Sequence, residues 1–269
     1  MGNSIINIVT IIQARTASSR LPGKVLLPLA NKNVLSKMVE RVKGAHLTGT
    51  VVVATTTLKE DDPIEDVCKK EKILFYRGHP TDLLDRHFKA GLKYNADVVI
   101  KIPSDCPLID PKIIDRVIKY FLKYSDEFDY VSNLHPATYP DGNDVEIIAM
   151  NSLRFGWARA RKNFEREHTT PFFWENPDRF RIGNVEWETK LDYSMTHRWT
   201  LDYEEDYQFI SKVYDELYPA NPRFDLYDIL SLLKRKPEIA EINKKYLGVN
   251  WYRHHLNELK TITLNQTRI

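Results

Sequence analysis

The sequence predicts an α/β fold with a doubly wound, mostly parallel sheet. Short β-branched, apolar runs alternate with segments of helical period as far as Met150, the order expected for β-α-β units. The runs are nearly continuous, which is typical of strands buried on both faces of a parallel sheet. With 269 residues, 42% of them hydrophobic, the chain is long enough for one such domain with modest additions.

The first predicted β-α-β unit contains the most informative stretch of the chain. Its strand begins near Asn7 and changes after Gln13 into a small polar loop that is closed by Pro-Gly-Lys at 22–24. Apolar residues at helical spacing predict a helix over 34–42, and a second buried strand is expected over 50–55. A strand, a helix and a second strand in this order indicate a parallel pair.

The next elements continue the same alternation. Asp110 and Pro111 supply a helix N-cap and a proline at the first helical position, ahead of one apolar stripe that ends near Leu122. The other periodic segments predict helices over 61–70 and 81–94, and strands over 73–76, 96–102, 128–132 and 144–150.

The pattern changes beyond Asn151. The segment 151–200 holds four of the five tryptophans, which indicates a lid, an acceptor pocket or a subunit contact, or equally a small aromatic subcore. We assign residues 1–218 to the main domain. The remaining expectations are a strand over 197–201, a helix over 207–217, a helical extension over 219–260 and a frayed polar tail over 261–269.

The composition narrows the possible partners. A formal net charge of +2 does not predict an electrostatic footprint for nucleic acid. Cys68 and Cys106 lie far apart, without a zinc-site spacing, and favour a reduced, cytoplasmic protein. Because the N-terminus lacks a secretory pattern and no apolar run approaches the roughly eighteen residues of a membrane span, we expect neither export nor a membrane partner.

The loop after the first strand is a candidate phosphate site. Arg15, Arg20 and Lys24 place three positive charges within ten positions. In open α/β sheets ligands bind beyond the carboxyl ends of the strands, and phosphates attract such cations. A P-loop is excluded because Ser18 and Val25 stand where its first glycine and its hydroxyl are required. An ordinary basic turn remains the alternative.

Two aspartates are candidates for holding a hard cation. Asp105 directly follows the strand that ends at Ile102, in a turn stiffened by prolines. Asp202 stands where the expected strand over 197–201 stops, which is the equivalent place in the topology. The alternative is that both aspartates only cap turns. The acids at 204–206 are explained more simply as first-turn residues that complement a helix dipole.

Seven segments occur together in an order that resembles one family. They are Q-A-R-T-A-S-S-R-L-P-G-K-V-L at 13–26, V-V-A-T at 52–55, D-D-P-I-E-D at 61–66, S-D-C-P-L-I-D-P at 104–111, P-D-G-N-D-V-E at 140–146, R-E-H-T-T-P at 166–171 and R-W-T-L-D at 198–202. The combination resembles the SpsF-type cytidylyltransferases of spore coat and surface polysaccharide synthesis. These enzymes are relatives of those that make CMP-activated Kdo and sialic acids.

The resemblance implies a nucleotide-diphospho-sugar transferase (glycosyltransferase-A-like, Rossmann-like) three-layer fold. It also implies Mg²⁺-dependent transfer of CMP from CTP, with release of pyrophosphate, by a protein that is often a homodimer. Arg15 and Lys24 would bind the triphosphate, while Asp105 and Asp202 would hold Mg²⁺. Further nucleotide contacts are expected from Ala14, Ser19, Arg20 and Ser104.

The acceptor is expected to be an acidic sugar of the ulosonic acid type or a related small acid. Arg166 and His168 belong to a matching segment and would bind its carboxylate or a phosphate. Asp144 and Glu146 would bind its hydroxyl groups or assist in deprotonating the nucleophile. Structural ion pairs are the alternative for all four residues. Kdo enzymes usually carry Q-G-D-E-P-L where this chain has P-S-D-C-P-L at 103–108, which retains the proposed metal ligand and leaves the acceptor open.

Two other functions are compatible with the same fold. A glycosyltransferase commonly has an Asp-x-Asp motif after a strand, whereas the strand ending at Ile102 is followed by Asp-Cys-Pro. An inactive scaffold is the other alternative, and the presence of both cations and both aspartates argues against it.

Overall fold

The central sheet confirms the predicted α/β architecture. In the computed structural model, which describes residues 6–268, seven strands form one sheet in the order β5-β4-β1-β6-β8-β7-β9. Of these strands only β8 runs antiparallel to its neighbours. The strands span Ile8–Gln13 (β1), Thr50–Thr56 (β4), Leu74–Gly78 (β5), Val98–Pro103 (β6), Tyr130–Ser132 (β7), Glu146–Ala149 (β8) and Ile182–Asn184 (β9).

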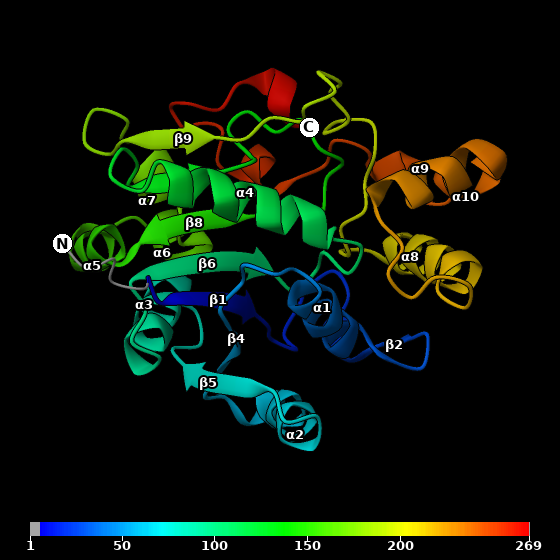
Figure 1. Ribbon diagram of the computed structural model, residues 1–269, viewed down its shortest axis with the longest axis horizontal. Coiled ribbons are helices and arrows are strands. Elements are labelled where there is room, and N and C mark those ends of the chain that lie inside the picture. Colours follow the sequence, from blue (N-terminus) through cyan, green and yellow to red (C-terminus); the bar gives the residue numbers. More distant parts are fainter. Residues whose placement is uncertain (1–5, 269) are drawn as a thin grey trace.

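Two helical layers cover the sheet. The helices α1 (Val34–Lys43) and α4 (Pro111–Lys123) lie over one face, and α3 (Leu83–Lys93) and α5 (Met150–Arg159) lie over the other (Figure 1). Successive residues of β1 alternate between these two layers, because side chains of a strand point to opposite faces in turn. Ile8 and Ile12 join the α1/α4 core, whereas Val9 and Ile11 join the α3/α5 core.

The predicted start of α4 is confirmed in detail. Pro111 is at the first helical position, and the Asp110 side chain accepts a hydrogen bond from the backbone N–H of Lys112 at 2.8 Å. The second carboxylate oxygen of Asp110 accepts from the N–H of Leu226, also at 2.8 Å. Leu226 opens α9 (Leu226–Arg235), so the same residue caps one helix and ties a later one to the sheet layer.

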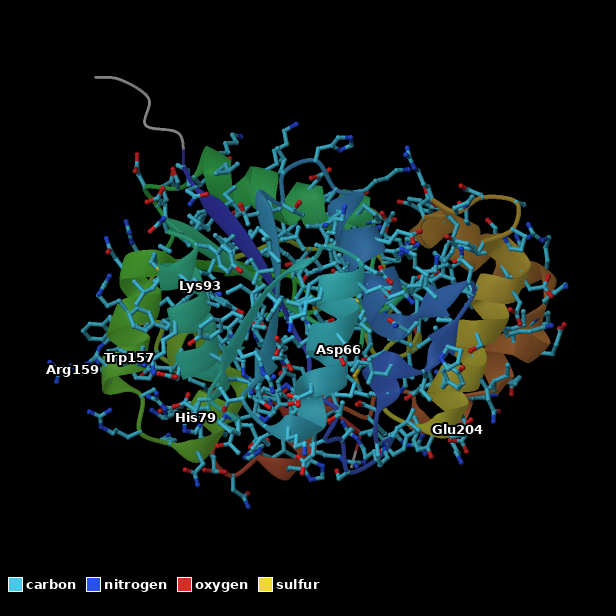
Figure 2. The ribbon with its side chains drawn as sticks, turned by 90° about the horizontal axis from the view of Figure 1, so that it is seen from below. Asp66, His79, Lys93, Trp157, Arg159 and Glu204 are labelled. Carbon is cyan, nitrogen blue, oxygen red and sulfur yellow. The ribbon has the colours of Figure 1, made fainter. Side chains whose placement is uncertain are left out.

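The aromatic segment after α5 is more regular than expected. It contains α6 (Asn163–His168), α7 (Pro171–Trp174) and β9, and its phenylalanines pack as a subcore under the α3/α5 face of the sheet. Trp157 lies beside α3, whose last residue, Lys93, is labelled in Figure 2. Its ring stacks on Phe88 with centroids 4.6 Å apart, and its indole N–H donates to Asp85.

Two predictions for the second half of the chain are wrong. The segment 197–201 is not a strand, because only Arg198 forms a bridge, to Asp141, and its neighbours bond to loops instead. The tail does not fray over the described residues 261–268, since Ile262 and Thr267 are buried. Figure 1 shows this last segment, coloured red, on the side of the sheet where β9 lies.

The remaining elements are short or lie outside the sheet layers. They are α2 (Asp62–Lys70), α8 (Glu204–Leu217), α10 (Pro237–Glu241), the hairpin of β2 (Pro28–Leu29) and β3 (Lys32–Asn33), and 3₁₀ turns at Lys24–Leu26, Lys59–Asp61, Lys244–Tyr246, Trp251–His254 and Leu264–Gln266. None of the helices in residues 6–268 has the length and apolar character that crossing a bilayer requires.

The buried histidine of α3 predicts a loss of stability in acid. His87 is fully buried, its Nε2 has no hydrogen-bond partner among residues 6–268, and burial lowers its pKa to about 3. The unfolded chain takes up a proton near pH 6.5 and the folded chain does not, so the free energy of unfolding falls as the pH drops below 6.5. We expect His87→Leu to remove about 2 to 3 kcal/mol of the decrease between pH 7 and pH 4.5, measured by urea unfolding.

His46→Gln is the matched control for this prediction. The His46 side chain is 88% exposed and pairs with Asp115 at the surface. This variant is expected to keep the wild-type pH dependence. If the unfolding free energy of His87→Leu depended on pH as in the wild type, His87 would not be the titrating group.

Candidate active site

A cleft of about 520 Å³ lies beyond the carboxyl ends of β1 and β6. These two strands are parallel neighbours, so the loops that follow them meet at the same edge of the sheet. The loop after β7, the α6–α7 segment, the segment around Asp202 and the C-terminal residues 248–252 also line the cleft. This is the place where open α/β sheets bind ligands.

The loop after β1 forms the cationic wall of the cleft. Its shape is fixed by Asp61, which accepts hydrogen bonds from the backbone and hydroxyl of Thr16 at 2.7 Å, and by Gly23, which turns the chain at a φ of +70°. Arg15 makes no ion pair or side-chain hydrogen bond within residues 6–268. All the expected nucleotide contacts of this loop line the cleft, namely Ala14, Arg15, Ser19, Arg20 and Lys24.

The Lys24 ammonium lies between the two predicted metal ligands. It donates to Asp105 Oδ2 and Asp202 Oδ1, each at 2.9 Å, and to the carbonyl oxygen of Leu201 at 2.6 Å. Burial alone would lower the pKa of Lys24, but the two carboxylates outweigh it and the pKa is raised. An ammonium has three N–H donors, so this arrangement uses all of them and leaves none for a phosphate.

Asp202 is surrounded by cations. Besides Lys24 it accepts from Arg20 at 2.6 Å and from Arg198 at 3.2 Å. Burial would raise its pKa, but the charges of Lys24 and Arg20 lower it to about 2. The residue is therefore an anion at any ordinary pH. Asp105 is less enclosed, with 28% of its side chain exposed, and Ser104 beside it also lines the cleft.

Arg198 and Asp206 position Asp202, and sequence reasoning missed this role. Arg198 is almost completely buried and donates to both carboxylate oxygens of Asp206, at 2.9 and 3.0 Å. One oxygen of Asp206 also accepts from the backbone N–H groups of Asp202 and Tyr203, both at 3.0 Å. Asp206 thus holds the turn that carries Asp202. Only the presence of Arg198 in the R-W-T-L-D segment signalled its importance.

The backbone conformation of Gly142 brings the Asp141 carboxylate to the cleft. Its φ of +106° is one that side chains disfavour, and an added Cβ would lie 2.8 Å from the carbonyl carbon of Trp199. This close approach lets the backbone of Asp141 pair with the segment 197–199. Burial and the charge of Asp144 raise the pKa of Asp141 well above its ordinary value.

The two predicted hydroxyl-binding acids differ in their surroundings. Glu146 pairs with Lys101 and accepts from the hydroxyl of Tyr130 at 2.6 Å, and Lys101 lowers its pKa against the effect of burial. Asp144 makes no ion pair within the described chain. Burial, followed by the charges of Asp105 and Glu146, raises its pKa to about 7. Both residues line the cleft, but only Asp144 has a carboxylate without a cationic partner.

The structure separates the predicted pair of Arg166 and His168. Arg166 does not line the cleft, because its guanidinium pairs with Asp82 and donates to the carbonyl of Trp157. The expectation that it binds an acceptor therefore gives way to a structural ion pair. His168 does line the cleft, stacked on Trp251, and burial lowers its pKa to about 3. Its imidazole is neutral at physiological pH.

The donor set at Asp105 and Asp202 fits a hard divalent cation. No group of three or more His, Cys, Asp or Glu side chains in residues 6–268 is arranged to hold a metal without further ligands. Mg²⁺ commonly takes one or two carboxylates and completes its shell with water and phosphate oxygens. The two aspartates already share one positive charge, that of Lys24, which shows that their oxygens are close enough to share an ion.

Comparisons with known proteins point to one family. The model of a family described as cytidylyltransferase matches residues 9–230. The spore coat polysaccharide biosynthesis protein SpsF of Bacillus subtilis is 29% identical over 239 residues, 87% of this chain and 97% of its own. The 3-deoxy-manno-octulosonate cytidylyltransferase of Trichlorobacter lovleyi is 35% identical over 150 residues, 54% of this chain and 58% of its own.

A solved structure gives the same result for the fold. The structure of a cytidylyltransferase from Leptospira borgpetersenii has a TM-score of 0.82 to this chain and 33% sequence identity. The alignment covers 88% of this chain and 97% of that one. The three-layer nucleotidyltransferase fold expected from the resemblance is thereby confirmed.

The buried network behind Asp202 predicts a large loss of stability in Arg198→Ala. The substitution leaves Asp206 buried without its cation, which costs about 3 to 5 kcal/mol of unfolding free energy in comparable buried pairs. Arg116→Ala is the control, because Arg116 pairs with Glu188 at the surface and should contribute less than about 1 kcal/mol. Equal losses in urea unfolding of the two variants would contradict the positioning role of Arg198.

Proposed function

The chain belongs to the cytidylyltransferase family, and on this premise we propose that it transfers CMP from CTP to a hydroxyl group of an acidic sugar. The acceptor is of the ulosonic acid type or a related small acid, and pyrophosphate is released. We further propose that the reaction requires Mg²⁺ and that the enzyme works as a cytoplasmic homodimer in surface polysaccharide synthesis. The similarity to SpsF and to a 3-deoxy-manno-octulosonate cytidylyltransferase supports the acceptor class.

One observation carries the proposal. Asp105 and Asp202, from segments far apart in the chain, both contact one cationic nitrogen beside the loop that presents Arg15 and Arg20. A nucleotide triphosphate needs a divalent cation and positive side chains on the same side, and this arrangement offers carboxylates that could hold the cation next to positive side chains. An ordinary basic turn or a pair of capping aspartates would not need such convergence.

The residues divide the work of an in-line attack on the α-phosphorus of CTP. When bound, Mg²⁺ supplies positive charge against the phosphate oxygens, and Asp105 and Asp202 would hold it. Arg15 is available to bind phosphate oxygens, since it makes no ion pair within residues 6–268. Lys24 keeps the two aspartates together, and its positive charge would lie beside the phosphates bound by this loop.

Asp144 is the carboxylate best suited to accept the proton of the attacking hydroxyl. It lines the cleft and has no cationic partner in the described chain, whereas Glu146 is paired with Lys101. A proton acceptor must be free to bond the nucleophile, which favours Asp144 over Glu146. With Arg166 turned away, an acid group of the acceptor would meet Arg15, whose five N–H donors can serve this group as well as the phosphate oxygens and whose charge contributes to lowering the pKa of His168.

The proposed reaction predicts pyrophosphate release that depends on an acceptor. The protein is incubated with CTP, Mg²⁺ and a panel of ulosonic acids and phosphorylated acids, and the products are identified by mass spectrometry. We expect a CMP-linked acid and one pyrophosphate for each CTP consumed. Consumption of a nucleotide sugar in place of CTP would identify a glycosyltransferase. No CTP binding by calorimetry in the presence of Mg²⁺ would identify an inactive scaffold.

Asp105→Asn tests the proposed metal site. The amide keeps the shape of the side chain and can still accept from Lys24, but it lacks the charge that binds a metal. We expect kcat to fall by about 10² to 10³-fold, with a higher Mg²⁺ requirement and little change in unfolding free energy.

Asp97→Asn is the matched control for this variant. Asp97 lies at the opposite end of β6, where it accepts from the backbone N–H of Asn7 at 2.8 Å. The activity of the Asp97→Asn variant should equal that of the wild type. Full activity in Asp105→Asn would remove this residue from the reaction.

A further inference from the structure

The C-terminal segment forms part of the cleft although it lies outside the family match. The match ends at residue 230, whereas Asn250, Trp251 and Tyr252 line the same cleft as Asp105 and Asp202. Arg198 holds the segment in place by donating to the carbonyl oxygen of Val249 at 2.6 Å. The extension is therefore fixed to the network that positions Asp202.

Rings from three separate segments pack together on this side of the cleft. Trp251 stacks on His168 with centroids 3.8 Å apart and planes 12° apart. Trp174 stacks on His135 with centroids 4.3 Å apart and packs in a T-shaped arrangement with Tyr252 at 6.1 Å. We call these five residues the aromatic wall. A wall of flat faces is a surface against which the C–H groups of a sugar can pack.

The aromatic wall is uncharged. Burial lowers the pKa of His168 to about 3 and that of His135 to about 4, so both imidazoles are neutral. Arg166, the cation expected here from the sequence, is held by Asp82 outside the cleft. A carboxylate or phosphate therefore finds no partner on the wall itself.

Several polar groups of the wall lack partners. Within residues 6–268 the Tyr252 hydroxyl, the indole N–H of Trp251 and the ring nitrogens of His168 make no hydrogen bond to the protein, although their residues line the cleft. Neutral donors and acceptors of this kind match the hydroxyl groups of a carbohydrate. A segment that served only to close the fold would not need to present unpaired polar groups to a cleft.

We propose that the aromatic wall is the acceptor subsite and binds the hydroxylated carbon chain of the sugar, with Trp251 and Tyr252 of the C-terminal extension as its specificity-determining residues. This assignment rests on the proposed function and deepens it. The chain of the acceptor packs on the rings and exchanges hydrogen bonds with the Tyr252 hydroxyl. The acid group of the acceptor lies away from the wall, toward Arg15.

Tyr252→Phe tests the hydrogen-bonding part of the assignment. It removes one hydroxyl that has no partner in the described protein, so the fold should be unaffected. We expect the KM for the acceptor to rise about tenfold, as for one lost hydrogen bond, while the KM for CTP stays within about twofold. Tyr227→Phe is the matched control, because Tyr227 is half exposed on α9 of the same extension and does not line the cleft.

A binding measurement makes the test independent of turnover. Saturation-transfer NMR is recorded on the whole protein with Mg²⁺, a non-hydrolysable CTP analogue and either 3-deoxy-manno-octulosonate or N-acetylneuraminate as the probe. We expect saturation to concentrate on the protons of the hydroxylated chain, to fall at least about fivefold in Trp251→Ala and to be unchanged in Tyr227→Phe.

The outcomes separate this inference from the proposed function. Saturation of neither probe in the wild type, or equal saturation in Trp251→Ala, would overturn the subsite. Loss of CTP binding in calorimetry would refute the proposed reaction while leaving the sugar contacts measurable. Turnover with an acceptor KM that Tyr252→Phe and Trp251→Ala leave unchanged would support the reaction and reject the aromatic wall as its acceptor site.

Discussion

The contact of the Lys24 ammonium with Asp105 and Asp202 is the constraint on which the site depends. It joins the loop after β1, the turn after β6 and the segment before α8, three parts of the chain that meet only through the sheet topology. Two carboxylates this close together, one of them buried, repel each other unless a cation lies between them. The ammonium meets this need within the protein, at the place where the proposed metal would bind.

A second layer of charge holds this contact in place. Arg198 connects Asp202 to Asp206 and to the carbonyl of Val249, and Asn243 donates to Asp206 as well. The main domain and the C-terminal extension are therefore joined through one buried guanidinium. The resulting cleft has a cationic wall at Arg15, a group of acids around Asp144 and the neutral aromatic wall. The proposed phosphate-binding end of the cleft is therefore separate from the proposed sugar-binding end.

Local signals in the sequence were sufficient for most of the main domain. The β-branched runs, the helical spacing and the Asp110-Pro111 start of α4 depend on neighbouring residues in the chain, and the structure confirms each of them. The cluster of Arg15, Arg20 and Lys24 after β1 and the aspartates at strand ends could be located in the same way, because in a parallel sheet the end of a strand fixes the edge to which its loop belongs.

The partners of side chains could not be predicted in this way, because they depend on contacts between distant segments. The sequence by itself determined the order of strands and helices and which residues stand at the carboxyl ends of the strands. Only the tertiary structure decided that Arg166 pairs with Asp82, that the segment 197–201 bonds to loops and that residues of the segment 261–268 are buried. It also placed Trp251 and Tyr252 in the cleft, since a side chain's role follows from what the fold brings within a few ångströms of it.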